Sequence, residues 1–157
     1  MAAFKFNLEF LITLRRRREE QAATSLAKRL SIIRELQERI SSMEEIKESL
    51  QADLQRHIQN GHVTPALLSL YSDFQTKLFQ DKRSAEELLA LSRREEAKER
   101  AILRKAVMER QLIERYKDKK VEDWKAEDLK EEQKILEEMA ALVKARKLRI
   151  ENDDSKP

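Results

Sequence analysis

Large apolar residues recur every three or four positions along most of this chain. In its first third their mean spacing is about 3.6 residues, which places them on one face of a single helix. They are Leu26, Leu30, Ile33, Leu36, Ile40, Met43, Ile46, Leu50, Leu54 and Ile58. A second row begins with Leu67, Tyr71, Phe74, Leu78, Ala85 and Leu88. Each row is narrow, so each predicted helix needs one partner helix, as in a coiled coil.

The two predicted helices are separated by one short polar segment. Asn60-Gly61 favours a left-handed backbone, which stops a helix. Thr64 can cap the next helix, with Pro65 at its first position. The sequence therefore predicts a single elongated domain over residues 1–157, made of a helix at 7–59, a turn at 60–64, a helix at 65–150 and a frayed tail at 151–157.

A hairpin would give each apolar row its partner within the chain. If the turn centres near Gly61, facing residues have numbers that sum to about 124. The resulting pairs are Leu54 with Leu70, Leu50 with Phe74, Ile46 with Leu78, Leu36 with Leu88, Ile33 with Leu91, Ile12 with Leu112, Leu11 with Ile113, and Leu8 with Tyr116. A parallel homodimer would not require this relation. We therefore predict an all-α fold, an antiparallel two-helix coiled-coil hairpin whose second helix is longer than its first.

The middle of the predicted hairpin has weaker layers than its ends. Residues 15–25 face residues 99–109, where Ala22 would meet Ile102 and Arg18 would meet Ala106. Because a buried Leu-sized side chain contributes about 1.5–3 kcal/mol, this stretch is held less firmly. It is either a soft, charged waist or a solvated stretch that tolerates imperfect layers.

The second helix is expected to outrun the first. Beyond about Lys119 no facing residue remains, and the ~30 residues to Ile150 extend about 45 Å. This segment carries an apolar stripe made of Val121, Trp124, Ile135, Leu136, Met139, Leu142 and Val143. An exposed apolar stripe usually marks a binding surface. The alternatives are that it pairs with a second copy or folds back on its own chain.

The composition favours long helices over a globular domain. Of the 157 residues 40% are charged and 5% aromatic, with one glycine, two prolines and no cysteine. The 33 basic and 30 acidic residues are interleaved and leave a net charge of +3, too small to indicate nucleic-acid binding. The one basic run, Arg15–Arg18, is followed at once by Glu19 and Glu20.

The sequence contains no group of residues typical of an active site. A two-helix coil has no interior wide enough for a water-excluding active site. The two histidines, His57 and His62, flank the turn without enough nearby ligands for zinc, and one glycine cannot build a phosphate loop. We therefore expect no enzyme, no metal and no cofactor.

The targeting signals are equally sparse. The N-terminal apolar run is too short for a signal peptide, and nothing approaches the ~20 apolar residues of a membrane span. The absence of cysteine fits a reducing compartment. A cytoplasmic location is expected, with a membrane reached only through a partner.

Two segments resemble the FliJ family, the soluble stalk proteins of the bacterial flagellar type III export apparatus. They are the opening Phe4–Arg15 (FKFNLEFLITLR) and Glu131–Ala140 (EEQKILEEMA). The chain length, the hairpin, the longer second helix and the Asn-Gly turn agree, so the resemblance covers almost the whole chain. Stalk proteins of virulence-type secretion systems look similar, and these residues do not separate the two systems.

The resemblance implies a fold and a set of partners. The family fold is an antiparallel two-helix coiled coil. The implied role is to insert into the pore of a hexameric export ATPase, promote its assembly and activity, and link it to a membrane export-gate protein. The family is also credited with escorting unloaded export chaperones. The free chain would be a monomer.

Site residues follow from the resemblance by position. The open end would bind the ATPase through Phe6, Phe10, Leu14, Arg15, Arg16, Arg17, Arg18, Ile113, Tyr116, Lys117 and Trp124. The turn half would bind the gate protein through Leu67, Tyr71, Phe74, Gln75 and Leu78, with Tyr71 the preferred candidate. This chain departs from some relatives in having Met43, Glu44 and Lys47 near the turn rather than aromatic residues. Each apolar candidate also fits a plain core role.

Two other functions compete with the stalk. The stripe between Trp124 and Val143 could bind an amphipathic helix of an export chaperone. The chain could instead be a self-associating structural coiled coil.

Overall fold

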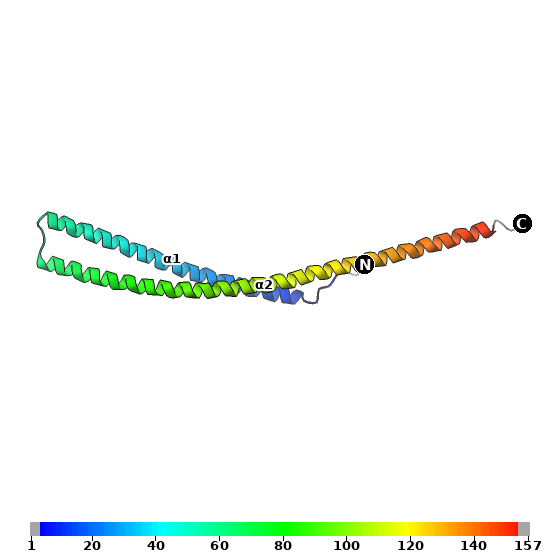
Figure 1. The fold of residues 1–157 in the computed structure, drawn as a ribbon, viewed down its shortest axis with the longest axis horizontal. Coiled ribbons are helices and arrows are strands. Elements are labelled where there is room, and N and C mark those ends of the chain that lie inside the picture. Colours follow the sequence, from blue (N-terminus) through cyan, green and yellow to red (C-terminus); the bar gives the residue numbers. More distant parts are fainter. Residues whose placement is uncertain (1–3, 154–157) are drawn as a thin grey trace. The chain divides into compact units, whose positions relative to one another are not determined.

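The structure, a computed structural model, describes the backbone of residues 4–153 and the side chains of residues 4–149. Helix α1 spans Glu9–Gln59 and helix α2 spans Pro65–Asp153, with no strand among the described residues. The chain reverses direction between the helices (Figure 1). With 51 residues in α1 and 89 in α2, the predicted all-α antiparallel hairpin with a longer second helix is confirmed.

The helix ends differ slightly from the predicted ones. Helix α1 begins at Glu9 rather than at Asn7, because Asn7 and Leu8 form a turn. Helix α2 continues to Asp153, three residues beyond the predicted end at Ile150. The rest of the predicted frayed tail, 154–157, lies outside the described residues.

The end of α1 is closed by a Schellman motif. The amide of His62 donates to the carbonyl of His57 at 3.0 Å, and the amide of Gly61 donates to the carbonyl of Ile58 at 3.2 Å. The motif needs a left-handed residue after the helix, and Gly61 supplies it with a φ of 70°. The Asn-Gly signal in the sequence therefore acts as predicted.

The start of α2 is capped by Thr64. Its Oγ1 accepts a hydrogen bond from the amide of Leu67 at 3.2 Å, and its carbonyl accepts one from the amide of Leu68 at 3.1 Å. Pro65 follows as the first helical residue, where a missing amide proton costs nothing. The predicted cap is confirmed.

Replacing Gly61 by alanine is expected to lower the free energy of unfolding by about 1 kcal/mol, because an alanine at positive φ is strained. A new Cβ would meet no atom within 4 Å, so the loss comes from the backbone alone. Urea unfolding followed by circular dichroism measures it. Gly61→Asn is the control and should lose less, because asparagine tolerates the left-handed region. Equal losses in the two variants would argue against this explanation.

The residues of α1 and α2 are divided between two compact units, each of which contains a part of both helices. Of the described residues, unit 1 comprises 4–15 and 109–153, and unit 2 comprises Arg16–Met108. The boundaries fall at the edge of the stretch that was expected to have weak layers. Within unit 2 the expected layers are themselves absent, because Arg18 and Ile102 are exposed, whereas Leu103 is half-buried.

In unit 2 the helices pack along one narrow row each. Ile33 on α1 and Ala85 and Ser92 on α2 are buried. Half-buried neighbours continue both rows: Leu26, Leu36, Ile40, Met43, Leu50 and Leu54 on α1, and Tyr71, Leu78, Leu89 and Leu103 on α2. These rows align when facing residues have numbers that sum to 125, as do Ile33 and Ser92, or Ile40 and Ala85.

The predicted pairs that use Leu70, Leu88 and Leu91 are therefore wrong, because the buried row on α2 lies one position away from the row that the predicted sum of about 124 selected. Leu88 and Leu91, the expected partners of Leu36 and Ile33, lie on the outer face with exposed fractions of 52% and 56%, and Leu70 is exposed as well. The observed row sets small residues opposite bulky isoleucines, a combination that lets two helices approach closely. It also gives charged residues of α1 partners of opposite sign on α2.

Unit 1 has its own small core. Ile12 is buried to an exposed fraction of 3%, and Leu11, Leu14 and Ile113 are half-buried. Two predicted pairs are not formed, because Leu112, the expected partner of Ile12, and Leu8, the expected partner of Tyr116, are exposed. Ile12 and Ile113 obey the same sum of 125.

Candidate functional site

The N-terminal segment of unit 1 is held against α2 by an aromatic layer. The rings of Phe6 and Tyr116 lie 6.2 Å apart at an interplanar angle of 52°. The Nζ of Lys117 lies 5.9 Å from the centroid of Phe6 and 2.7 Å from the Oε2 of Glu9. The predicted ATPase-binding residues Phe6, Tyr116 and Lys117 are thus brought together.

A second pair of aromatic rings involves Trp124, which lies eight residues beyond Tyr116 on α2. The rings of Phe4 and Trp124 are 6.0 Å apart at 52°, and Trp124 is half-buried. Two expectations are therefore wrong. Side chains of α2 are still partly buried beyond Lys119, and neither Val121 nor Trp124 belongs to an exposed stripe. The chain ahead of α1 supplies this cover, which helix periodicity could not show. The alternating Phe-Lys-Phe in the opening segment was the available signal.

The other predicted ATPase-binding residues divide into core and surface. Leu14 and Ile113 are half-buried in unit 1, and Arg15 forms an ion pair with Glu109 of α2. Phe10 is the outlier, because 78% of it is exposed. Arg16, Arg17 and Arg18 belong to unit 2 and are exposed.

The predicted gate-binding residues lie in the part of unit 2 nearest the turn. Leu67, Tyr71, Gln75 and Leu78 are half-buried, and Phe74 is exposed. An apolar hollow of about 350 Å³ is lined by Leu50, Leu67, Leu70, Tyr71 and Phe74. Sequence reasoning missed Leu70, which it assigned to the core, and Phe79, which is exposed and lines a neighbouring hollow.

An ion pair bridges the helices beside these hollows. The Nζ of Lys82 donates to the Oε1 of Glu44 at 2.7 Å. This hydrogen bond, with the charge of Lys82, lowers the pKa of Glu44 below its usual 4.5. The same hydrogen bond raises the pKa of Lys82 above its usual 10.5. The pair therefore stabilises unit 2 across neutral pH. Its contribution is lost when the pH falls through the pKa of Glu44 or rises through that of Lys82.

Replacing Lys82 by methionine is expected to return the pKa of Glu44 towards 4.5. Lys98→Met is the reciprocal control, because Lys98 lowers the pKa of Glu95 in the same way. Carboxyl titration by NMR measures both groups in each variant. Each substitution should raise the pKa of its own partner and leave the other unchanged. A Glu44 pKa that stays low in Lys82→Met would show that another group sets it.

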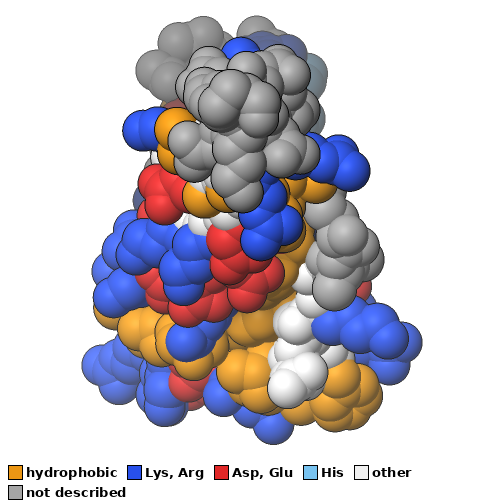
Figure 2. Space-filling view, turned by 90° about the vertical axis from the view of Figure 1, so that its right-hand side faces the viewer, with side chains coloured by type: hydrophobic (Ala, Val, Ile, Leu, Met, Phe, Trp, Pro, Cys, Tyr) orange, Lys and Arg blue, Asp and Glu red, His pale blue; other side chains and the backbone are white. Residues whose placement is uncertain are grey.

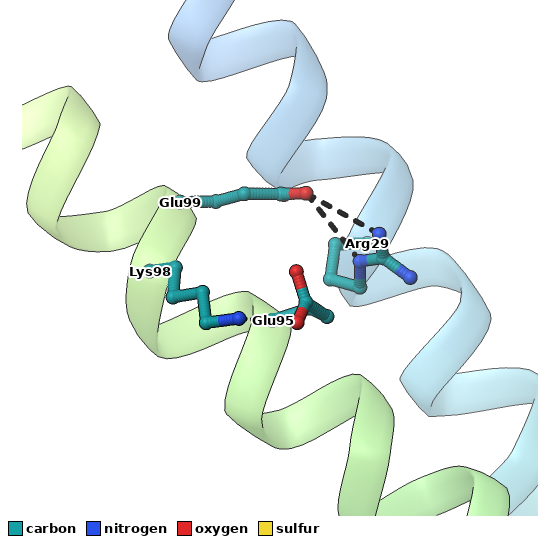
Figure 3. Close-up of polar contacts among 4 residues, drawn as sticks. All are labelled: Arg29, Glu95, Lys98 and Glu99. Atoms are coloured by element: carbon teal, nitrogen blue, oxygen red, sulfur yellow. Dashed lines mark hydrogen bonds and ion pairs between the residues drawn. The ribbon is translucent and has the colours of Figure 1, made fainter.

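A polar layer crosses unit 2 near its middle (Figure 3). The Nε and Nη2 atoms of Arg29 on α1 both donate to the Oε1 of Glu99 on α2 at 3.4 Å. Glu95 and Lys98, on the same helix as Glu99, pair with each other at 2.7 Å. The Oε2 of Glu99 is buried without a hydrogen-bond partner among the described residues. Such a layer selects one alignment of two helices.

Every described side chain from residue 129 to residue 149 is exposed. Ile135, Met139 and Leu142 therefore form an exposed stripe, as predicted, together with Leu136 and Val143. On the face drawn in Figure 2, basic and acidic side chains lie beside one another, with apolar side chains exposed between them.

The described residues include no group of three or more His, Cys, Asp or Glu side chains that could hold a metal ion. Within the same part of the chain, no helix has both the length and the apolar content required to cross a membrane.

These features define a class, the helical hairpins whose exposed apolar rows and ion-paired seams suit them to packing against other helices. The family model described as "Flagellar FliJ protein" matches residues 4–149. The chain therefore belongs to the FliJ family, as the resemblance predicted, and is a flagellar-export-related protein of a non-enzymatic family. No curated protein and no solved structure matches the chain.

Proposed function

We propose that this chain is the stalk of the flagellar export machinery. It inserts into the pore of the hexameric export ATPase, promotes assembly and ATP hydrolysis, and links the ring to the membrane export-gate protein. It works in the cytoplasm, at the inner face of the membrane, through that gate protein. The family match supports the flagellar system over a virulence-type one.

The observation that carries the proposal is the exposure of Phe10 on a firmly packed end. The layers Phe6–Tyr116 and Phe4–Trp124 tie the segment before α1 to α2, so unit 1 offers two paired chain segments rather than a lone helix. Phe10 projects from this end with 78% of its surface exposed. An exposed aromatic side chain on a rigid scaffold is typical of a binding hot spot.

The proposed contact with the export-gate protein lies in unit 2. The apolar hollow around Tyr71 and Phe74, close to the turn, is open to solvent and fits an apolar anchor from a partner. Tyr71 remains the preferred contact, because a half-buried phenol can pack and hydrogen-bond at once.

Stimulation of the ATPase requires differential binding. A two-helix stalk is asymmetric, so its contacts with the subunits of a ring cannot all be equal. Contacts that favour some subunit conformations over others shift the ring towards those conformations.

The test is to mix the chain with the export ATPase and to measure its assembly by mass photometry and its hydrolysis rate. Both should rise. Phe10→Ser should weaken the effect roughly tenfold, as expected for a hot spot. Phe79→Ser is the matched control, an exposed phenylalanine in unit 2, and should leave stimulation unchanged. The stalk assignment fails if the unaltered chain changes neither property at concentrations where the ring forms.

Export-chaperone escort is the second candidate function, and the exposed stripe at Ile135, Met139 and Leu142 favours it. An amphipathic chaperone helix would pack on this stripe. Calorimetric titration with an unloaded export chaperone should show binding that Leu142→Asp abolishes and Phe79→Asp retains. Equal binding by both variants would place the chaperone elsewhere.

A further inference from the structure

The last described turns of α2 present an apolar row that no other described segment covers. We call residues 129–149 the C-terminal overhang. Six of its large apolar residues lie on one helix face, because at 3.6 residues per turn they fall within an arc of about 140°. They are Leu129, Ile135, Leu136, Met139, Leu142 and Val143, each at least half exposed. A row of this kind is more stable when covered by another helix.

The charges of the overhang are divided between its two halves. Residues 130–138 hold Glu131, Glu132, Glu137 and Glu138 with two lysines, a net charge of −2. Residues 139–149 hold Lys144, Arg146, Lys147 and Arg149 with no acidic residue, a net charge of +4. The dividing point is Met139, which also lies at the centre of the apolar row.

We propose that the overhang binds the overhang of a second copy of this chain in antiparallel orientation, with the two helices crossing near Met139. In this arrangement the acidic half of each helix lies against the basic half of the other, so the dimer contains two contacts between opposite charges. A parallel pair would set like charges against each other along its whole length. Because the same surface serves both partners, the contact is self-complementary and closes at a dimer.

The dimer is weak and sensitive to salt. The overhang offers only three heptads, and the polar Gln133 and Arg146 interrupt its row. Short helix pairs of this kind dissociate in the micromolar range, on the order of 10 µM or above. Salt screens the exposed charge pairs, so dissociation increases with ionic strength. The free chain is then monomeric only below this concentration.

Self-association and chaperone binding use the same stripe and exclude each other. The contact between copies is independent of whether the chain stimulates an ATPase, because the proposed ATPase contact lies at Phe10. A failure of one proposal can therefore be distinguished from a failure of the other.

Sedimentation equilibrium of the full chain tests the dimer, from 1 to about 200 µM at low and high salt. The expected result is a reversible monomer–dimer equilibrium that salt weakens. Met139→Glu should raise the dissociation constant at least tenfold. Met108→Glu alters a methionine outside the overhang that is 68% exposed, against 60% for Met139, and should leave the dissociation constant unchanged. A monomer at every concentration, or a dimer unaffected by Met139→Glu, overturns the proposal.

Cysteine pairing tests the orientation, and the natural chain has no cysteine to interfere. Leu129→Cys chains mixed with Arg146→Cys chains should form mixed disulfide dimers under mild oxidation, because Arg146 lies on the same helix face as Met139. Leu129→Cys alone should form few, because an antiparallel pair holds its two copies far apart. Efficient crosslinking of Leu129→Cys to itself would show a parallel pair and contradict the inference.

Discussion

Ile33→Ala is expected to lower the free energy of unfolding by about 2–4 kcal/mol, the largest loss from truncating one side chain in unit 2. Ile33 is buried to an exposed fraction of 7%, and the sum of 125 pairs it with the small, buried Ser92. Removing its side chain leaves a gap in the seam that α1 and α2 cannot close without shifting. The long rows on either side offer few other buried contacts to compensate.

The chain contains its own control for this experiment. Ile32 adjoins Ile33 on α1, has the same side chain, and is 43% exposed. Ile32→Ala should lose less than about 1 kcal/mol, because more than two fifths of its surface already contacts water. Urea denaturation followed at 222 nm compares the two variants. A larger loss for Ile32 than for Ile33 would mean that the helices pack in a different register.

Arg29→Leu is expected to lower the free energy of unfolding by about 1–3 kcal/mol. The substitution leaves Glu99 without its cross-helix partner, and the side chain of Glu99 is only 17% exposed. Glu99→Leu should cost a similar amount for the reciprocal reason. The double variant Arg29→Leu/Glu99→Leu should recover most of the loss, because two leucines form an apolar layer in the same place.

A double-mutant cycle measures the coupling between these two residues. Arg83→Leu is the matched control, because Arg83 pairs with Glu87 on the same helix and both side chains are about 70% exposed. That exposed pair should contribute little. Additive losses at Arg29 and Glu99, with no recovery in the double variant, would show that the layer contributes no pairing energy.

The sequence predicted the fold because its strongest signals are local. Gly61 at positive φ, the cap at Thr64 and the 3.6-residue rows each depend on neighbouring residues. These features are sufficient to place two helices and one turn. They agree with the structure to within three residues at every helix end.

The register was less predictable, because α2 carries two adjacent rows one residue apart. The outer row contains Leu70, Phe74, Leu88 and Leu91, and it matches α1 better by apolar content alone. The structure instead uses the row of Ala85, Leu89 and Ser92. The buried row contains the small residues Ala85 and Ser92, and Arg29 pairs with Glu99 across the helices. Neither feature is visible in a pattern of apolar and polar letters.

The candidate site was predicted in part, and from the family resemblance rather than from periodicity. Phe6, Tyr116 and Lys117 come together although Phe6 lies ahead of α1. The layer of Phe4 and Trp124 depends on an irregular segment ahead of α1, which periodicity does not describe. The sequence predicted an apolar stripe beyond the first helix and left open whether it is free, pairs with a second copy or folds back, and the described side chains of residues 129–149 are all exposed.

The proposed contact of the end that carries Phe10 with the ATPase ring is tested most directly by photo-crosslinking. A photoreactive phenylalanine analogue placed at Phe10, and in a second chain at Phe79, is irradiated in the presence of the assembled ATPase. Crosslinks are expected from position 10 to residues that line the ring's pore, and none are expected from position 79. Crosslinks to the ATPase from position 79, with none from position 10, would contradict the proposed contact.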